Sequence, residues 1–245
     1  MSAPVPDLVA HRISTGIFYQ MYNEYGLQFA EYFGLLLQEY VGEILRNSVP
    51  TPALTSEEGV RSTYTDQRGP VPDWIVLEGN TAVLIECKAT RFSRSALATG
   101  SKTAIDSSLK QLLKGLGQAI RFKKACQRRE PGLENLSGVG AFSIVFVSLE
   151  PLHLVNSYFF RQYIDQLLAA DALYDDSWVV LSIQDLEMLQ PHLAAGISIS
   201  EVISRLRTEN ASSVLNDVSC RTGLSYQNSF LYEKDRELYE RLQVQ

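Results

Sequence analysis

Hydrophobic positions in the first part of the chain recur at intervals of three and four residues. This spacing predicts two amphipathic helices within residues 3–46, broken near Gly26. The apolar residues that show it are Leu27, Tyr32, Leu35, Leu36, Tyr40 and Ile44. Residues 48–72 are rich in Pro and Gly, which is typical of a loop, with one short strand expected at 60–65.

Two dense apolar runs follow, at residues 73–78 and 81–88, and they are joined by Gly79-Asn80. A two-residue pair of this kind between apolar runs predicts a β-hairpin with a tight turn. If Gly79-Asn80 is the loop, the two residue numbers of each cross-strand pair add up to 159, so Asp73 lies opposite Glu86.

The rest of the chain alternates between helical and strand patterns. The apolar spacing predicts a helix over about 104–129, a strand over 142–150, a helix near 155–170, a strand over 178–183 and further helices. The pairs Ser182 with Asp185 and Ser198 with Glu201 have capping-box spacing at helix starts. This order predicts an α/β domain whose sheet is covered on both faces, with a core over residues 1–185 and a helical lobe over 186–245 packed on it.

Composition narrows the class of protein. The chain has 245 residues, of which 45% are apolar and 10% aromatic, and this excludes a disordered tail, a coiled coil or a collagen-like fibre. No apolar run approaches the length that spans a bilayer, and the first residues lack a signal-peptide pattern, so we expect a cytoplasmic protein without a membrane partner. Three scattered Cys and three scattered His argue against disulfides and against a His/Cys metal centre.

The predicted hairpin brings acidic side chains together. Asp73 and Glu86 would share one face with their Cβ atoms about 5 Å apart, and Lys88 would lie beside them on that face. Opposed like charges destabilise a sheet. A divalent cation such as Mg²⁺ or Mn²⁺ would offset this repulsion, because it prefers oxygen ligands. The alternative is a solvated strand end at which Lys88 forms a local salt bridge.

These residues resemble a known family. Pro72-Asp73 followed by Glu86-Cys87-Lys88 resembles the signature of the PD-(D/E)XK nuclease superfamily, and the resemblance covers residues 30–185. It implies a restriction-endonuclease-like core, in which a mixed sheet has helices on both faces. Glu39 resembles the acid that many members contribute to the metal site, with Glu43 as its rival. Gln118 and Phe122 resemble the Q-x-x-x-Y motif of some branches, with Phe in place of Tyr.

The resemblance implies a Mg²⁺-dependent or Mn²⁺-dependent nuclease, with DNA a better substrate than RNA. Asp73, Glu86 and the backbone carbonyl of Cys87 would hold the metal, together with Glu39, directly or through water. Lys88 would orient the attacking water or stabilise the charged transition state, and Gln118 would be part of the catalytic site. The Cys87 side chain would point to the opposite face as a core residue.

The distribution of charge is uneven. Residues 88–129 carry eleven basic side chains and one acid, a charge of +10, whereas the remainder carries eleven basic and twenty-seven acidic side chains, a charge of −16. A basic stripe of this kind attracts phosphate backbones. The predicted nucleic-acid-binding residues are Arg91, Arg94, Lys102, Lys110, Lys114, Arg121 and Lys124. The loop over 91–102 has only Phe92 as a stacking residue, which does not support a single-strand stacking platform there.

Other readings remain open. The chain could be a nucleic-acid-binding module of the same fold without catalysis, or a nuclease subunit that is active only with a partner chain. The acidic C-terminal lobe, with Leu231, Leu238 and Leu242 in one stripe, either closes a face of the sheet or forms the surface of a homodimer or larger complex.

Overall fold

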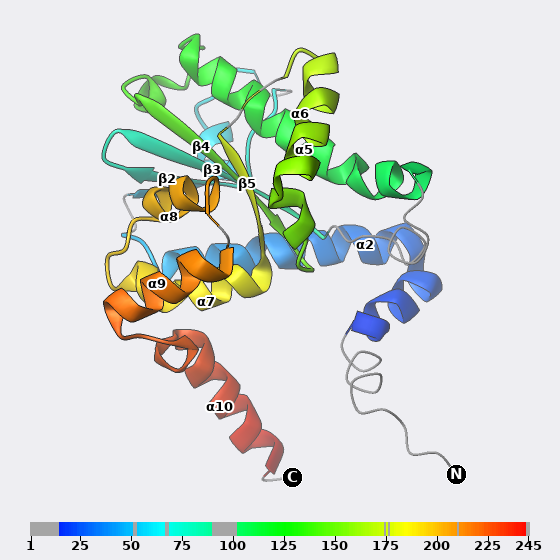
Figure 1. The fold of residues 1–245 in the computed structure, drawn as a ribbon, viewed down its shortest axis with the longest axis vertical. Helices are drawn as coiled ribbons and strands as arrows, with labels where there is room; N and C mark the ends of the chain where they lie inside the picture. Colours follow the sequence, from blue (N-terminus) through cyan, green and yellow to red (C-terminus); the bar gives the residue numbers. More distant parts are fainter. Residues whose placement is uncertain are drawn as a thin grey trace.

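The computed structural model describes residues 15–50, 53–66, 69–89, 102–173, 175, 177–209 and 211–243. Its centre is a five-stranded mixed sheet in the order β1-β2-β3-β4-β5 (Figure 1). The first three strands are antiparallel neighbours, and β4 and β5 continue parallel to β3. The strands are β1 (Leu54–Ser56), β2 (Trp74–Glu78), β3 (Thr81–Lys88), β4 (Ala141–Ser148) and β5 (Trp178–Ser182). The α/β class and the mixed sheet predicted from the sequence are therefore confirmed.

The β2–β3 hairpin has the predicted register. Ile75 pairs with Leu84 and Trp74 with Ile85, as a two-residue Gly79-Asn80 turn requires. Gly79 has a φ of 57°, in the left-handed region that glycine adopts without a steric penalty. The turn fixes the register, and the register places Asp73 and Glu86 at the same end of the hairpin.

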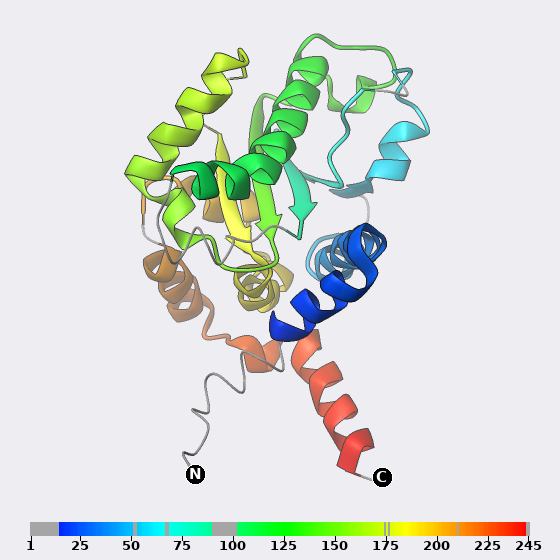
Figure 2. The same cartoon turned by 90° about the vertical axis from the view of Figure 1, so that its right-hand side faces the viewer.

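Helices cover both faces of the sheet, as Figure 2 shows. On one face lie α5 (Lys102–Gln127) and α6 (Tyr158–Ala170), and on the other lie α2 (Thr15–Arg46), α7 (Ile183–Ala194), α8 (Ile199–Leu206) and α9 (Ala211–Thr222). Alternate residues of β3 serve the two faces, because side chains alternate along a strand. Leu84 belongs to the apolar cluster under α5, and Ile85 belongs to the cluster under α2 and α7.

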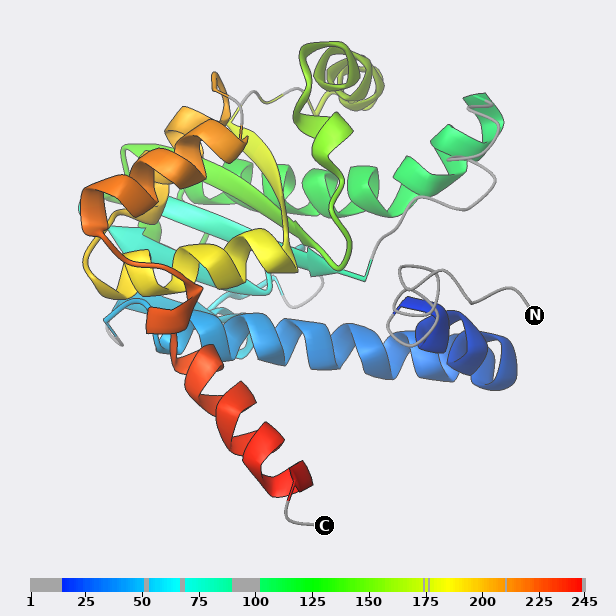
Figure 3. The same ribbon diagram turned by 60° about the horizontal axis from the view of Figure 1, so that its bottom comes forward.

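Helix α2 is bent at Gly26, where φ is 60° and ψ is −136°. The predicted break is thus confirmed. The segment before Gly26 folds back on the segment after it, and Phe18 packs between Phe29 and Phe33 with ring centroids 5.1 and 4.9 Å away. Beyond the sheet, α2 and the first half of α5 extend in the same direction (Figure 3).

The C-terminal helices share their core with the sheet. Buried residues of α7, α8 and α9 belong to the same apolar cluster as Val83 and Val145 of the sheet. The last helix, α10 (Phe230–Gln243), extends away from the body (Figure 1). In it Leu231 is buried, but Leu238 is 58% exposed, so the predicted leucine stripe is packed only at its start. None of the helices in the described ranges is both long and apolar enough to span a bilayer.

Two local predictions need correction. The strand expected at 60–65 is wrong, because β1 lies earlier and is followed by the short helix α3 (Glu57–Arg61), whose N-cap Ser56 accepts a hydrogen bond from the Gly59 N–H. The Ser182 capping box is confirmed. At Ser198 only half of the box forms: the Ser198 hydroxyl accepts from the Glu201 N–H, but the Glu201 side chain pairs with Arg221. The Glu78 carboxylate accepts from the N–H groups of Ile199 and Ser200 at the same helix start.

Candidate functional site

Asp73 lies immediately before β2, at the open end of the hairpin. Its side chain is 7% exposed, and its Oδ2 accepts a hydrogen bond of 2.6 Å from the backbone N–H of Cys87. The carbonyl of Asp73 accepts from the N–H of Glu57, which ties the first residue of α3 to the same place. The carboxylate is therefore fixed beside the end of β3.

Glu86 is held beneath helix α5. The carboxylate is 2% exposed, and a Cβ built on Gly115 would lie 3.1 Å from the Cγ of Glu86 and 2.7 Å from the ring of Phe146. The close approach of α5 to β3 and β4 therefore requires glycine at position 115. Glu86 Oε1 pairs with Lys88 Nζ at 2.6 Å, whereas Oε2 is buried with no hydrogen-bond partner in the described part of the chain.

The charges of these three side chains interact. Burial, followed by the charge of Asp73, raises the pKa of Glu86 to about 7. Burial also raises the pKa of Asp73, although the Lys88 ammonium opposes that rise. For Lys88, burial lowers the pKa, but the two carboxylates outweigh it and raise the pKa overall. Lys88 thus stays protonated between two acids whose ionisation is unfavourable.

The backbone of Cys87 faces the same site. In a strand, the N–H and C=O of one residue point to the same side. Because the Cys87 N–H points to Asp73, its carbonyl oxygen also points past the end of β2 rather than to β4. The Cys87 thiol lies in the opposite apolar cluster, and burial raises its pKa well above the usual range, which fits a core residue rather than a nucleophile.

A cleft of about 570 Å³ opens beside this end of the hairpin, between α2 and α5. Asp73, Cys87 and Lys88 form its floor, and its other lining residues are Leu27, Ala30, Glu31, Gly34, Leu35, Gln38, Ala89 and Gln111. Sequence reasoning did not single out Glu31, Gln38 or Gln111. The signal was present on α2, where Leu27, Glu31, Gly34 and Gln38 have the spacing of one helix face.

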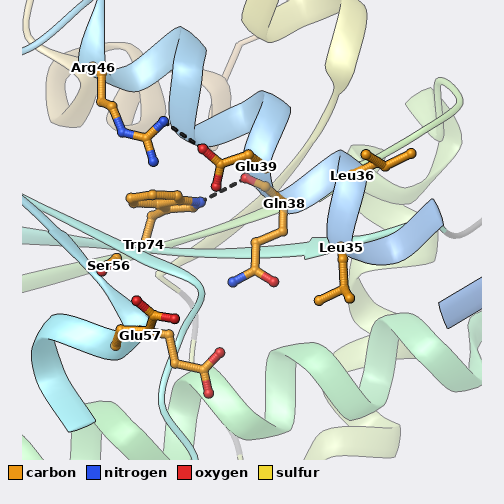
Figure 4. A pocket seen from close by; sticks show the side chains of 9 residues that line it. Leu35, Leu36, Gln38, Glu39, Arg46, Ser56, Glu57 and Trp74 are labelled. Carbon is orange, nitrogen blue, oxygen red and sulfur yellow. Dashed lines mark hydrogen bonds and ion pairs between the residues drawn. The ribbon is translucent and has the colours of Figure 1, made fainter. Parts of the chain in front are cut away.

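Glu39 does not line this cleft. It pairs with Arg46 at 2.8 Å and lines a second pocket, where the Arg46 guanidinium lies 5.0 Å from the ring of Trp74 (Figure 4). Its rival Glu43 pairs with Lys234 of α10. The structure therefore brings neither Glu39 nor Glu43 to the hairpin carboxylates. The acid of α2 that lines the cleft beside Asp73 is Glu31.

Gln118 lies on α5, on the face that covers the sheet. It follows Gly115 by three residues and Gln111 by seven, so the three positions share one side of the helix. Its Oε1 atom is buried without a hydrogen-bond partner among the residues described. Phe122 is fully buried and packs edge-on against Tyr64, with ring centroids 6.2 Å apart.

The predicted basic stripe divides into two parts. Lys102, Lys110, Lys114 and Arg121 are exposed and form no ion pair with any described carboxylate. Further along α5, Lys124 donates to the carbonyl of Ala172, and its neighbour Lys123 pairs with Asp175 at 2.6 Å. Arg91 and Arg94 lie outside the described residues. The free basic side chains include Lys110 and Lys114, which flank Gln111 beside the cleft.

The described residues contain no group of three His, Cys, Asp or Glu side chains arranged to hold a metal ion. A cation at the hairpin would thus have two carboxylate ligands, with its other ligands from backbone, water or substrate. No protein-family model matches the chain, and a search of curated proteins finds no similar sequence. The site must therefore be interpreted from its own chemistry.

Proposed function

We propose that this protein is a metal-dependent nuclease that hydrolyses phosphodiester bonds, with DNA as the preferred nucleic acid. The observation that carries the proposal is a pair of buried carboxylates, Asp73 and Glu86, with Lys88 at the floor of a cleft. The resemblance of Pro72-Asp73 and Glu86-Cys87-Lys88 to the PD-(D/E)XK signature supports it, and so does the mixed α/β sheet.

The donor set suits a hard divalent cation. Mg²⁺ binds oxygen ligands and in phosphoryl-transfer sites uses one or two carboxylates, together with water and substrate phosphate. Asp73, Glu86 and the Cys87 carbonyl offer such oxygens, and the unpartnered Oε2 of Glu86 would gain a partner. When bound, the ion would lower the pKa of a water ligand and offset negative charge on the scissile phosphate.

Lys88 is the hydrogen-bond donor and the cation of the site. It is 31% exposed on the cleft side and stays charged because both carboxylates raise its pKa. An ammonium there can hydrogen-bond the attacking water or a non-bridging phosphate oxygen as charge develops on it. Glu31, Gln38 and Gln111 line the same cleft and supply further polar contacts for water and substrate.

The test is hydrolysis of plasmid DNA and of RNA in Mg²⁺, Mn²⁺ or EDTA. Lys88→Met should lower the rate by at least about 100-fold, the scale expected for losing a group that stabilises transition-state charge. Arg236→Met is the matched control, because Arg236 is 65% exposed on α10. Cleavage that persists in EDTA, or that survives in Lys88→Met, would contradict the proposal.

Two rivals make different predictions. A silent module of the same fold would bind nucleic acid in a salt-sensitive way without cutting any substrate. A partner-dependent subunit would cut only after the partner is added, and the adjacent exposed residues Leu238 and Tyr239 of α10 would then be where the partner binds.

A further inference from the structure

The two walls of the catalytic cleft differ in chemistry. On the α2 side, the residues that line the cleft include one acid, Glu31, and no Lys or Arg. Leu27 and Leu35 of this wall are 71% and 63% exposed. On the α5 side, Lys110 and Lys114 are exposed beside the lining residue Gln111. One wall is therefore apolar and acidic, and the other is basic.

The apolar wall is preformed. The fold-back of α2 at Gly26 is braced by Phe18, which packs against Phe29 and Phe33. On the other side of the bend, the Trp74 indole N–H donates to the carbonyl of Gln38 at 3.0 Å, which ties α2 to the hairpin. Leu35 points from α2 toward α5 (Figure 4). The leucines are thus held in place over the cleft without a described residue covering them.

We propose that the cleft binds an unpaired, single-stranded segment of nucleic acid, with its phosphates along α5 and its bases against the leucines of α2. This inference rests on the proposed nuclease function and specifies its substrate. A single strand carries charged phosphates along one side and exposes its bases on the other. The phosphates match the basic wall on α5, and the bases match the apolar wall on α2. A duplex presents phosphates on both strands, so one strand would meet the acidic wall that contains Glu31.

The substrate preference can be measured without catalysis. Binding of an oligonucleotide of about 20 nucleotides, longer than usual single-strand site sizes, is followed by fluorescence anisotropy in EDTA, beside the duplex of the same sequence. We expect the single strand to bind at least about 10-fold more tightly than the duplex at equal salt. Equal or tighter binding of the duplex would overturn the inference.

Variants of the apolar wall test whether Leu27 and Leu35 form the surface that contacts the bases. Leu35→Glu and, independently, Leu27→Glu should weaken single-strand binding about 10-fold, because each removes apolar contact with bases and adds a negative charge beside the strand. Leu238→Glu on α10 makes the same chemical change at a residue of similar exposure and should have no effect. Both leucines are exposed, so folding is expected to survive, which circular dichroism checks. Equal effects of Leu35→Glu and Leu238→Glu would overturn the inference.

Lys114→Gln tests the basic wall. It should weaken binding and reduce the dependence of log K on log salt by about 0.7, the contribution of one phosphate contact on a single strand. An unchanged salt slope in both Lys114→Gln and Lys110→Gln would mean that the phosphates do not follow α5.

Failure of this inference can be told apart from failure of the nuclease proposal. Lys88-dependent hydrolysis of duplex and single strand at equal rates would overturn the single-strand assignment and leave the nuclease standing. Preferential single-strand binding that Leu35→Glu abolishes, without hydrolysis in any metal, would support the assignment and contradict the nuclease. Absence of binding to any oligonucleotide would overturn the single-strand assignment and point to a protein as the occupant of the cleft.

Discussion

Two glutamates of one hairpin, Glu78 and Glu86, have opposite surroundings. The Glu78 carboxylate lies at the start of α8 and accepts hydrogen bonds from the Ser198 hydroxyl and the N–H groups of Ile199 and Ser200, at 2.7 to 2.8 Å. Glu86 is 2% exposed, its Oε1 pairs with Lys88, and its Oε2 has no partner among the described residues.

The difference separates a structural acid from a functional one. A carboxylate that caps a helix N-terminus satisfies free N–H groups and interacts favourably with the helix dipole. A carboxylate buried beside a second carboxylate is harder to ionise and opposes folding when charged. Stability therefore accounts for Glu78 but not for Glu86, and perturbed acids of the second kind are concentrated at catalytic sites.

A large loss of stability is expected when Glu78 is replaced. Glu78→Ala removes three hydrogen bonds at the start of α8 and should lower the free energy of unfolding by about 2–3 kcal/mol, the scale for charge-assisted hydrogen bonds. Glu78→Gln keeps one carbonyl acceptor and should lose less. Urea unfolding measures both, with the exposed Glu237→Ala as the control. A change below about 0.5 kcal/mol in Glu78→Ala, as at ordinary surface sites, would contradict the assignment.

At Glu86 the expected effect depends on pH. The pKa of Glu86 is raised in the folded state to about 7, whereas its ordinary pKa is 4.5, so between these pH values the folded protein keeps a proton that the unfolded chain loses. In metal-free buffer the free energy of unfolding should therefore fall as pH rises from 4.5 to 7, by up to about 3 kcal/mol, and level off above.

Glu86→Gln should remove this part of the pH dependence. Its free energy of unfolding, measured in EDTA across the same range, should exceed that of the native chain at pH 8, where the native carboxylate is charged. Hydrolytic activity should be lost in the same variant. An identical pH profile in both proteins would show that Glu86 does not titrate in this range, and the contrast with Glu78 would then disappear.

Sequence patterns predict the hairpin well because few interactions decide it. The length of the Gly79-Asn80 turn sets the register, and a period of two assigns each side chain to a face, so the pairing of Ile75 with Leu84 follows without tertiary information. The three-residue strand β1 has too little pattern to be recognised. The signal for α3 was instead the N-cap Ser56 followed by two acids, Glu57 and Glu58.

The surroundings of the site are less predictable, because they depend on how whole helices sit on the sheet. Glu31, Glu39 and Glu43 all lie on α2, and only the docking of that helix on Trp74 decides that Glu31 lines the cleft. Helical spacing also cannot show which basic residues serve the fold. Lys123 forms an ion pair with Asp175 and is therefore unavailable to a phosphate, whereas Lys114 is exposed and available.

The smallest expected effect tests the metal directly. If the dissociation constant for Mg²⁺ is about 1 mM, then about 10 mM Mg²⁺ should stabilise the folded protein by about 1.4 kcal/mol, seen as a rise in Tm. The rise should be larger at pH 8 than at pH 6, because Glu86, with a pKa of about 7, must lose its proton to bind the ion. Glu86→Gln should lose the rise and Glu78→Gln should keep it, since only the first removes a carboxylate from the Asp73–Glu86 pair. A Tm rise of equal size in both variants would place the ion elsewhere and leave the burial of Glu86 without a chemical reason.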